Sequence, residues 1–126
     1  MKRVLALCLI CCLLLGLSAC YLEDDKGKNV TVTFRVIHED GTEKEVKITT
    51  DEKYLGDALL AEKLVEKPAQ AGGIYEVVDG ERADWSDNEA WWRFLKDGVE
   101  LTVGIDDAEL TDGAVYEAVF THGFGE

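Results

Sequence analysis

Residues 29–50 read NVTVTFRVIHEDGTEKEVKITT, and this stretch decides the fold. From Val30 to Val36 apolar residues alternate with threonine and arginine, which is the period of a half-buried β-strand. Asp40-Gly41 is a turn dipeptide, because glycine adopts a positive φ without steric cost. Alternation then resumes over Glu45–Thr49. We therefore predict that the domain opens with a β-hairpin.

The period changes after this hairpin. Four leucines recur at the spacing of one helix face, namely Leu55, Leu59, Leu60 and Leu64. Thr50 or Asp51 could cap the start of this helix with a side-chain oxygen. Pro68 disfavours helical geometry at the residue before it, so the helix is expected to end before Pro68.

The rest of the chain is expected to form strands separated by Asp-Gly turns. The expected strands cover residues 74–78, 91–96, 99–103 and 114–121. One amphipathic helix can cover one face of a mixed sheet, which is a two-layer arrangement. The sequence therefore predicts a single small α+β domain, β-grasp-like, over residues 30–121, followed by a frayed tail at 122–126.

The N-terminal segment has the pattern of a secretory signal. Lys2 and Arg3 precede an apolar run, Val4–Leu17, that is shorter than the ~20 residues of a membrane-spanning helix. Residues 17–20 read LSAC and resemble the lipobox of bacterial lipoproteins, in which Cys20 carries the lipid. An ordinary signal peptide with a chance cysteine is the alternative. We expect a signal peptide at 1–19, a lipid-bearing Cys20 with a tether at 20–29, and anchoring on the outer face of the cell membrane.

Composition excludes several classes of function. The chain has 13 basic and 26 acidic residues, and nucleic-acid binding needs the opposite charge. All four cysteines lie at or before position 20, so the domain beyond it has no disulfide. The only histidines are His38, expected to be solvated beside a turn, and His122 in the tail. Nucleophile-elbow, phosphate-loop and zinc patterns are absent, so we expect a protein that is not an enzyme and requires no cofactor or metal.

The tryptophans form a cluster. Trp85, Trp91 and Trp92 are the only ones in the chain, and Phe94 follows. In a strand, Trp91 and Arg93 would face one way and Trp92 and Phe94 the other. One face must pack on the core, and the other would expose aromatic surface of the kind that marks a binding site; alternatively, Trp91 only covers the rim of the core. Residues 84–89 also resemble half of a calcium loop, but without its glycine.

Three segments carry a family resemblance. Residues 90–98 (AWWRFLKDG), 103–107 (VGIDD) and 110–113 (LTDG) resemble the C-terminal β-rich domain of the cobalamin carriers transcobalamin and intrinsic factor. The helix segment 55–59 (LGDAL) matches the same pattern. A large bacterial group shares this domain, often as secreted proteins or lipoproteins of unassigned function. The resemblance covers residues 30–121.

The resemblance implies a ligand site. In the carriers this domain closes over the corrin face of cobalamin with aromatic and apolar side chains. Carried over by position, and with Trp85 added from the tryptophan cluster, the candidates are Trp85, Trp91, Trp92, Arg93, Phe94, Leu95, Gly104 and Ile105. The chain departs from the carriers at Arg93, where they have glutamine, and at Ala108, where they have an aromatic residue.

Two functions from different classes follow from these observations. The first is a cell-surface binding module for cobalamin, another corrinoid or another flat hydrophobic ligand, with a membrane transporter as partner. The alternative is a module that docks an envelope protein or polysaccharide and has no small-molecule ligand. The chain is too short to contain the helical barrel with which the carriers enclose cobalamin.

Overall fold

The computed structural model describes residues 29–124. The expected signal peptide, Cys20 and nearly all of the tether lie outside the described residues. Within residues 29–124, no helix combines the length and the apolar character needed to cross a membrane. The elements follow one another as β1 (Val30–Ile37), β2 (Glu43–Thr50), α2 (Leu55–Ala61), β3 (Val77–Val78), β4 (Glu81–Arg82), α3 (Trp85–Asn88), β5 (Ala90–Lys96), β6 (Val99–Glu100), a 3-10 turn η1 (Ile105–Asp107) and β7 (Val115–His122).

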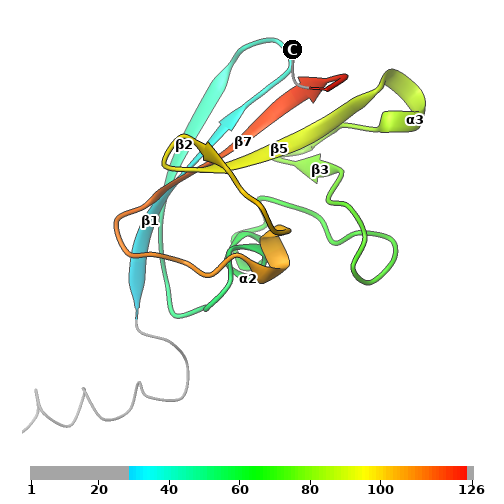
Figure 1. Cartoon of the computed structure of the whole chain (residues 1–126). Helices are drawn as coiled ribbons and strands as arrows, with labels where there is room; N and C mark the ends of the chain where they lie inside the picture. The colour runs from blue at the N-terminus through cyan, green and yellow to red at the C-terminus, as the bar shows by residue number, and fades with distance from the viewer. Residues whose placement is uncertain (1–28, 125–126) are drawn as a thin grey trace, which may run out of the picture.

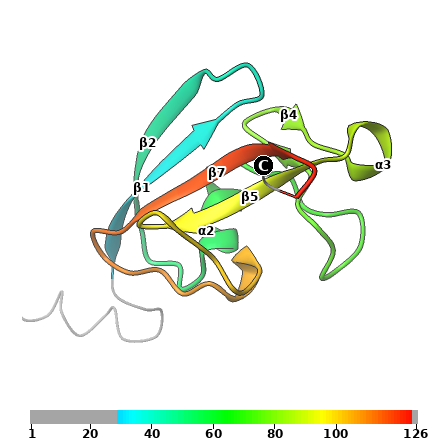
Figure 2. The same ribbon diagram turned by 45° about the horizontal axis from the view of Figure 1, so that its top comes forward.

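The main sheet has the strand order β2-β1-β7-β5-β6. The first and last strands, β1 and β7, lie side by side and parallel, whereas the other neighbours are antiparallel (Figure 2). A parallel pair needs a long crossover, and here the crossover includes α2, which lies against one face of the sheet (Figure 1). This arrangement confirms the predicted class, a small α+β domain with a mixed, β-grasp-like sheet.

The core lies between that face and α2. Phe34 of β1 is paired in register with Tyr116 of β7, and both side chains are fully buried. Alternate residues on both strands point to the same core, as the period of two requires. The buried residues of this core come from within residues 32–120, and Val30 packs against them.

Helix α2 is shorter than predicted and is not capped by a side chain. It ends at Ala61, because Lys63 adopts a left-handed φ of 58° and turns the chain away. Leu64 still packs in the core from this turn, so its helical spacing was misleading. At the start, Tyr54 is the N-cap residue and makes no side-chain cap.

The prediction that Thr50 or Asp51 caps the helix was wrong, because a main-chain hydrogen bond holds the N-terminus of α2 instead. The Leu55 N–H donates to the Ala108 carbonyl, 2.8 Å away. Thr50 Oγ1 instead accepts from the Glu52 N–H within the preceding loop.

The chain between α2 and β5 departs most from the expected strands. Only Val77–Val78 of the expected strand 74–78 is regular, and it pairs with β4 outside the main sheet. The turn between β3 and β4 is Asp79-Gly80, with both residues at positive φ, as an Asp-Gly hairpin turn requires.

The C-terminal end of the described chain also differs from the prediction. Strand β7 includes His122, and the Gly123 N–H donates to the Glu89 carbonyl. Residues 122 and 123 are therefore held in place, contrary to the frayed tail expected from residue 122.

Candidate functional site

Two adjoining cavities lie on either side of Trp92 of β5. The first has a volume of about 540 Å³ and the second about 460 Å³. The first is lined by Gly72, Gly73, Ile74, Tyr75, Trp92, Phe94, Gly104, Ile105, Asp106 and Asp107. The second is lined by Ile74, Glu76, Ala83, Trp85, Ala90, Trp91, Trp92, Gly123 and Phe124. Because they share Ile74 and Trp92, we call them the paired cavities.

Trp92 is the fixed wall between the paired cavities. It lies on the core side of β5, is only 4% exposed, and packs edge-on against Phe120 at 5.3 Å between ring centroids. Its indole N–H lies 3.0 Å from the Glu76 carbonyl and 3.2 Å from the Glu81 carbonyl. Glu76 directly precedes β3 and Glu81 is the first residue of β4, so the β3–β4 hairpin fixes the orientation of the indole.

The polar end of the first cavity is built by Tyr75 and Asp106. The Tyr75 hydroxyl donates to Asp106 Oδ1 at 2.6 Å. Burial of Tyr75, together with the hydrogen bond to Asp106 and its negative charge, raises the pKa of the phenol well above its ordinary value. Gly56 permits this arrangement, because a Cβ atom there would lie 2.5 Å from Asp106 Oδ1 and 3.3 Å from the Asp106 backbone. The glycine of the LGDAL segment therefore lets α2 approach η1.

The second cavity has an apolar rim. The Trp91 indole N–H donates to the Gly123 carbonyl at 2.7 Å, which holds the end of the chain against β5. Phe124 then lies against Trp85, with 5.7 Å between ring centroids. Both rings are exposed, and Ile74 is 77% exposed. These three side chains bring hydrophobic surface to the mouth of one cavity, although they come from three separate segments.

The candidate residues divide into two groups. The paired cavities bring together Trp85, Trp91, Trp92, Phe94, Gly104 and Ile105. Arg93 and Leu95 alternate with Trp92 and Phe94 along β5 and line neither cavity. Arg93 forms an ion pair with Glu100 at 2.8 Å, and Leu95 is buried beside the partner strands.

The sequence-based candidates leave out many of the lining residues, among them Ile74, Tyr75 and Phe124. The first two were assigned to a strand, and their exposed or cavity-facing positions depend on the irregular loop before β3. A signal was available in Gly72-Gly73, since paired glycines before apolar residues indicate a loop. Phe124 was assigned to a frayed tail, and nothing in the local sequence indicated its contact with Trp85.

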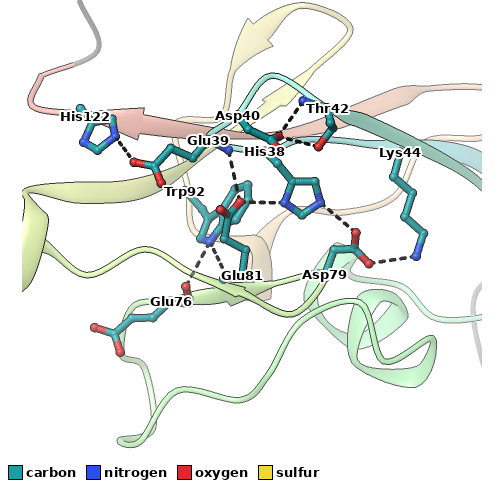
Figure 3. A network of polar contacts seen from close by, with 10 residues as sticks. All are labelled: His38, Glu39, Asp40, Thr42, Lys44, Glu76, Asp79, Glu81, Trp92 and His122. Carbon is teal, nitrogen blue, oxygen red and sulfur yellow. Dashed lines mark hydrogen bonds and ion pairs between the residues drawn. The ribbon is translucent and has the colours of Figure 1, made fainter.

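His38 is not solvated, contrary to the sequence prediction. Its side chain is largely buried, with Nδ1 2.7 Å from Glu81 Oε1 and Nε2 2.9 Å from Asp79 Oδ2 (Figure 3). Its ring also meets Trp92 edge-on, 6.0 Å between centroids. Burial opposes a charge on the ring, but the hydrogen bonds to Glu81 and Asp79 outweigh it and raise the pKa of His38. The turn dipeptide Asp79-Gly80 brings these carboxylates to His38, and their separation in sequence concealed the contact.

Within residues 29–124, no group of three or more histidine, cysteine, aspartate or glutamate side chains is arranged to hold a metal ion. The segment that resembled half of a calcium loop forms α3 instead. Asp84 is its N-cap, and its carboxylate accepts from the Ser86 N–H at 2.9 Å.

The fold and the paired cavities define a small α+β domain with a hollowed, partly aromatic face, and a solved structure places it in a family. A Ruminococcus gnavus ATCC 29149 protein described as a "putative metal binding protein" is 34% identical, with a TM-score of 0.70, over 75% of this chain and 99% of that one. The chain belongs to the same family as this protein. No protein-family model matches the chain, and no curated protein matches it significantly.

A second solved structure shows the same fold at greater distance. Haptocorrin in complex with Cbi matches with a TM-score of 0.62 at 12% identity, over 75% of this chain and 25% of haptocorrin. The expected likeness to the transcobalamin family is therefore present as a distant structural resemblance. At this identity the match establishes the fold alone.

Proposed function

We propose that this domain binds a flat hydrophobic ligand in the paired cavities, and that the ligand is a corrinoid such as cobalamin. The observation that carries the proposal is the geometry around Ile74. This exposed side chain projects between two adjoining cavities whose common wall is Trp92, and Trp85 and Phe124 extend the apolar surface at one end. Both volumes lie within the range of small-molecule sites.

Two further facts support a corrinoid over other flat ligands. The sequence resembles the β-rich domain of cobalamin carriers, and haptocorrin, whose fold this chain shares, was solved in complex with Cbi. The residues that would contact the ligand are those the cavities bring together, chiefly Trp85, Trp92, Phe94 and Ile105. Arg93 and Leu95 are left out of this proposal because they line neither cavity.

The charge of the cavity lining indicates which kinds of flat ligand the paired cavities favour. The lining includes Glu76, Asp106 and Asp107, and, within the described part of the chain, no lysine or arginine. Carboxylates at a cavity rim favour a ligand edge that is neutral or cationic and donates hydrogen bonds. The amide groups at the edge of a corrinoid meet this requirement, whereas the carboxylates of a porphyrin do not.

A porphyrin bearing free carboxylates is therefore expected to bind more weakly than a corrinoid with amide side chains. Like charges repel most at low ionic strength, so the difference should narrow as salt is added. Equilibrium dialysis of both ligands at low and high salt measures this. Tighter binding of the carboxylate-bearing ligand at low salt would contradict the assignment of ligand class.

The sequence also predicts where in the cell this binding would take place. Lipid on Cys20 would hold the domain on the outer face of the membrane, and a tether of nine residues reaches roughly 30 Å. An open, one-sided site buries less of a ligand than a closed cleft, so its affinity alone is modest. Tethering near a membrane transporter would raise the effective concentration of the domain and offset this.

Ile74→Asp tests the site directly. A carboxylate at this position should weaken corrinoid binding by at least about tenfold, because it removes apolar contact and places a charge between the cavities. The measurement is saturable quenching of tryptophan fluorescence in a soluble chain starting at Tyr21, corrected for ligand absorbance and checked by equilibrium dialysis.

Val99→Asp is the matched control. Val99 is 70% exposed on β6 and lines neither cavity, so the same change of chemistry should leave affinity unchanged. Equal losses in both variants would place the ligand elsewhere. If the wild-type protein shows no saturable binding, the alternative is favoured, and Ile74→Asp should then abolish capture of a defined envelope protein or polysaccharide.

A further inference from the structure

The strongest unexplained feature of the molecule is the charged cluster of His38, Asp79 and Glu81, which contacts Trp92 through the His38 ring. We infer that His38 is a proton-dependent positioning residue: its protonated ring ties the β3–β4 hairpin to the main sheet and thereby orients Trp92, the common wall of the paired cavities. The effect on the ligand rests on the proposed function. The effect on Trp92 does not.

The geometry requires both ring nitrogens of His38 to act as donors. Nδ1 faces Glu81 Oε1 at 2.7 Å and Nε2 faces Asp79 Oδ2 at 2.9 Å (Figure 3). A neutral imidazole carries one N–H, so it can donate to only one of these carboxylates. Loss of the proton therefore breaks one contact and sets a nitrogen lone pair against a carboxylate oxygen.

Glu81 connects this contact to the cavity wall. Its carboxylate accepts from His38, while its backbone carbonyl lies 3.2 Å from the Trp92 indole nitrogen. The Glu76 carbonyl, at the other end of the same hairpin, is the second acceptor for Trp92. The hairpin is not part of the main sheet. Main-chain hydrogen bonds such as Asp79 N–H to the Leu64 carbonyl join it to the segment after α2, and the contacts of Asp79 and Glu81 with His38 join it to the end of β1. A shift of the hairpin would move both acceptors of the indole.

Other charged groups face the cluster from each neighbouring element. Lys44 on β2 lies 2.9 Å from Asp79 Oδ1 and remains when His38 loses its proton. In the β1–β2 turn, the Asp40 carboxylate accepts from Thr42, which lowers the pKa of Asp40, with a smaller contribution from the charge of His38. Glu39 pairs with His122 of β7 at 2.7 Å. When His38 loses its proton, Lys44 is the remaining positive charge beside the Asp79 and Glu81 carboxylates, so the group of these four side chains becomes net negative.

The direction of the pH effect follows from the two shifted groups. The pKa of His38 is raised above 6.5, so its contribution to stability is complete below that value and is lost as the pH rises through the raised pKa. Burial opposes ionisation of Asp79, but hydrogen bonds from Lys44 and His38 outweigh it and lower its pKa below 3.8. The contribution of Asp79 is lost only as the pH falls through that lowered value. The cluster is therefore complete in mildly acidic solution and opens on the alkaline side.

The test follows the Trp92 indole N–H by ¹H–¹⁵N NMR while the pH is raised through the titration of His38, in the soluble chain starting at Tyr21. The Trp92 signal should shift with the same midpoint as the His38 ring. His38→Gln should place the signal near its alkaline wild-type position at every pH. His122→Gln removes the other imidazole, which reaches Trp92 only through Phe120, so the Trp92 midpoint should still follow His38 in that variant. Corrinoid affinity should fall at least about fivefold across the same range, a typical size for coupled sites.

A Trp92 signal that does not follow His38 in the wild-type protein would overturn the inference, as would His38→Gln titrating like wild type. The wild-type titration decides the question even if a variant fails to fold. Absence of corrinoid binding with an intact Trp92 titration would overturn the proposed function and leave the positioning role standing. Corrinoid affinity that is constant with pH while Trp92 titrates would overturn the link between them.

Discussion

Trp92→Ala is expected to lower the free energy of unfolding by about 3–5 kcal/mol, the usual cost of removing a large buried aromatic side chain. Trp92 is 4% exposed, and it packs on Phe120 and His38. Truncation leaves a void at the junction of the core and the paired cavities. It also removes the indole donor from the Glu81 and Glu76 carbonyls, which adds to the cost, although the Glu76 carbonyl keeps the Ala83 N–H as a donor.

Urea unfolding followed by far-UV circular dichroism measures this loss. Trp92→Phe separates the two contributions, because it keeps an aromatic ring and removes only the donor and part of the volume. Its cost should be intermediate, about 1–3 kcal/mol. Trp85→Ala is the control: this ring is exposed in α3, so stability should change by about 0.5 kcal/mol or less. Equal losses for Trp85→Ala and Trp92→Ala would contradict the assignment of Trp92 as the buried wall.

The strands were predictable from the sequence because burial imposed a period of two on them. Val30–Val36 alternates cleanly, since β1 has one face on the core and one that is only half-buried. In β7 the burial alternates from Val115 to Phe120, but the sequence there is nearly continuous in apolar residues. The helix length was not predictable, because Leu64 contributes to the core from a turn and so continues the helical spacing past the end of α2. The helix start was set by the Leu55–Ala108 hydrogen bond, a contact between residues far apart in the sequence.

The site was predictable only where it lies on regular structure. The spacing of Trp92 and Phe94 placed both on one face of β5, and the structure puts that face against the core and the first cavity. Arg93 and Leu95 became candidates because the family resemblance was carried over to every position of this strand, and a resemblance by position does not distinguish its two faces. Ile74 and Phe124 lie in irregular segments, where no period exists and tertiary contacts determine every position.

The register of the central strands leads to the second large expected effect. Phe34→Ala should destabilise the domain by about 3–5 kcal/mol. Phe34 is fully buried on β1, between Val46 of β2 and Tyr116 of β7. Its cavity cannot collapse easily, because three hydrogen-bonded strands fix the backbones around it. The cost should therefore lie at the upper end of the range for buried aromatic residues.

Thr33→Ala is the matched control, one residue away on the same strand. Thr33 points to the opposite face and is only half-buried, so truncation should cost about 1 kcal/mol or less. Both variants should unfold with the slope of the wild type in urea, since neither changes the surface exposed on unfolding by much. Comparable losses for both variants would mean that β1 has two buried faces. The open side of the sheet, with Arg93 and the Arg35 ion pairs to Glu43 and Glu117, would then have to be covered in solution.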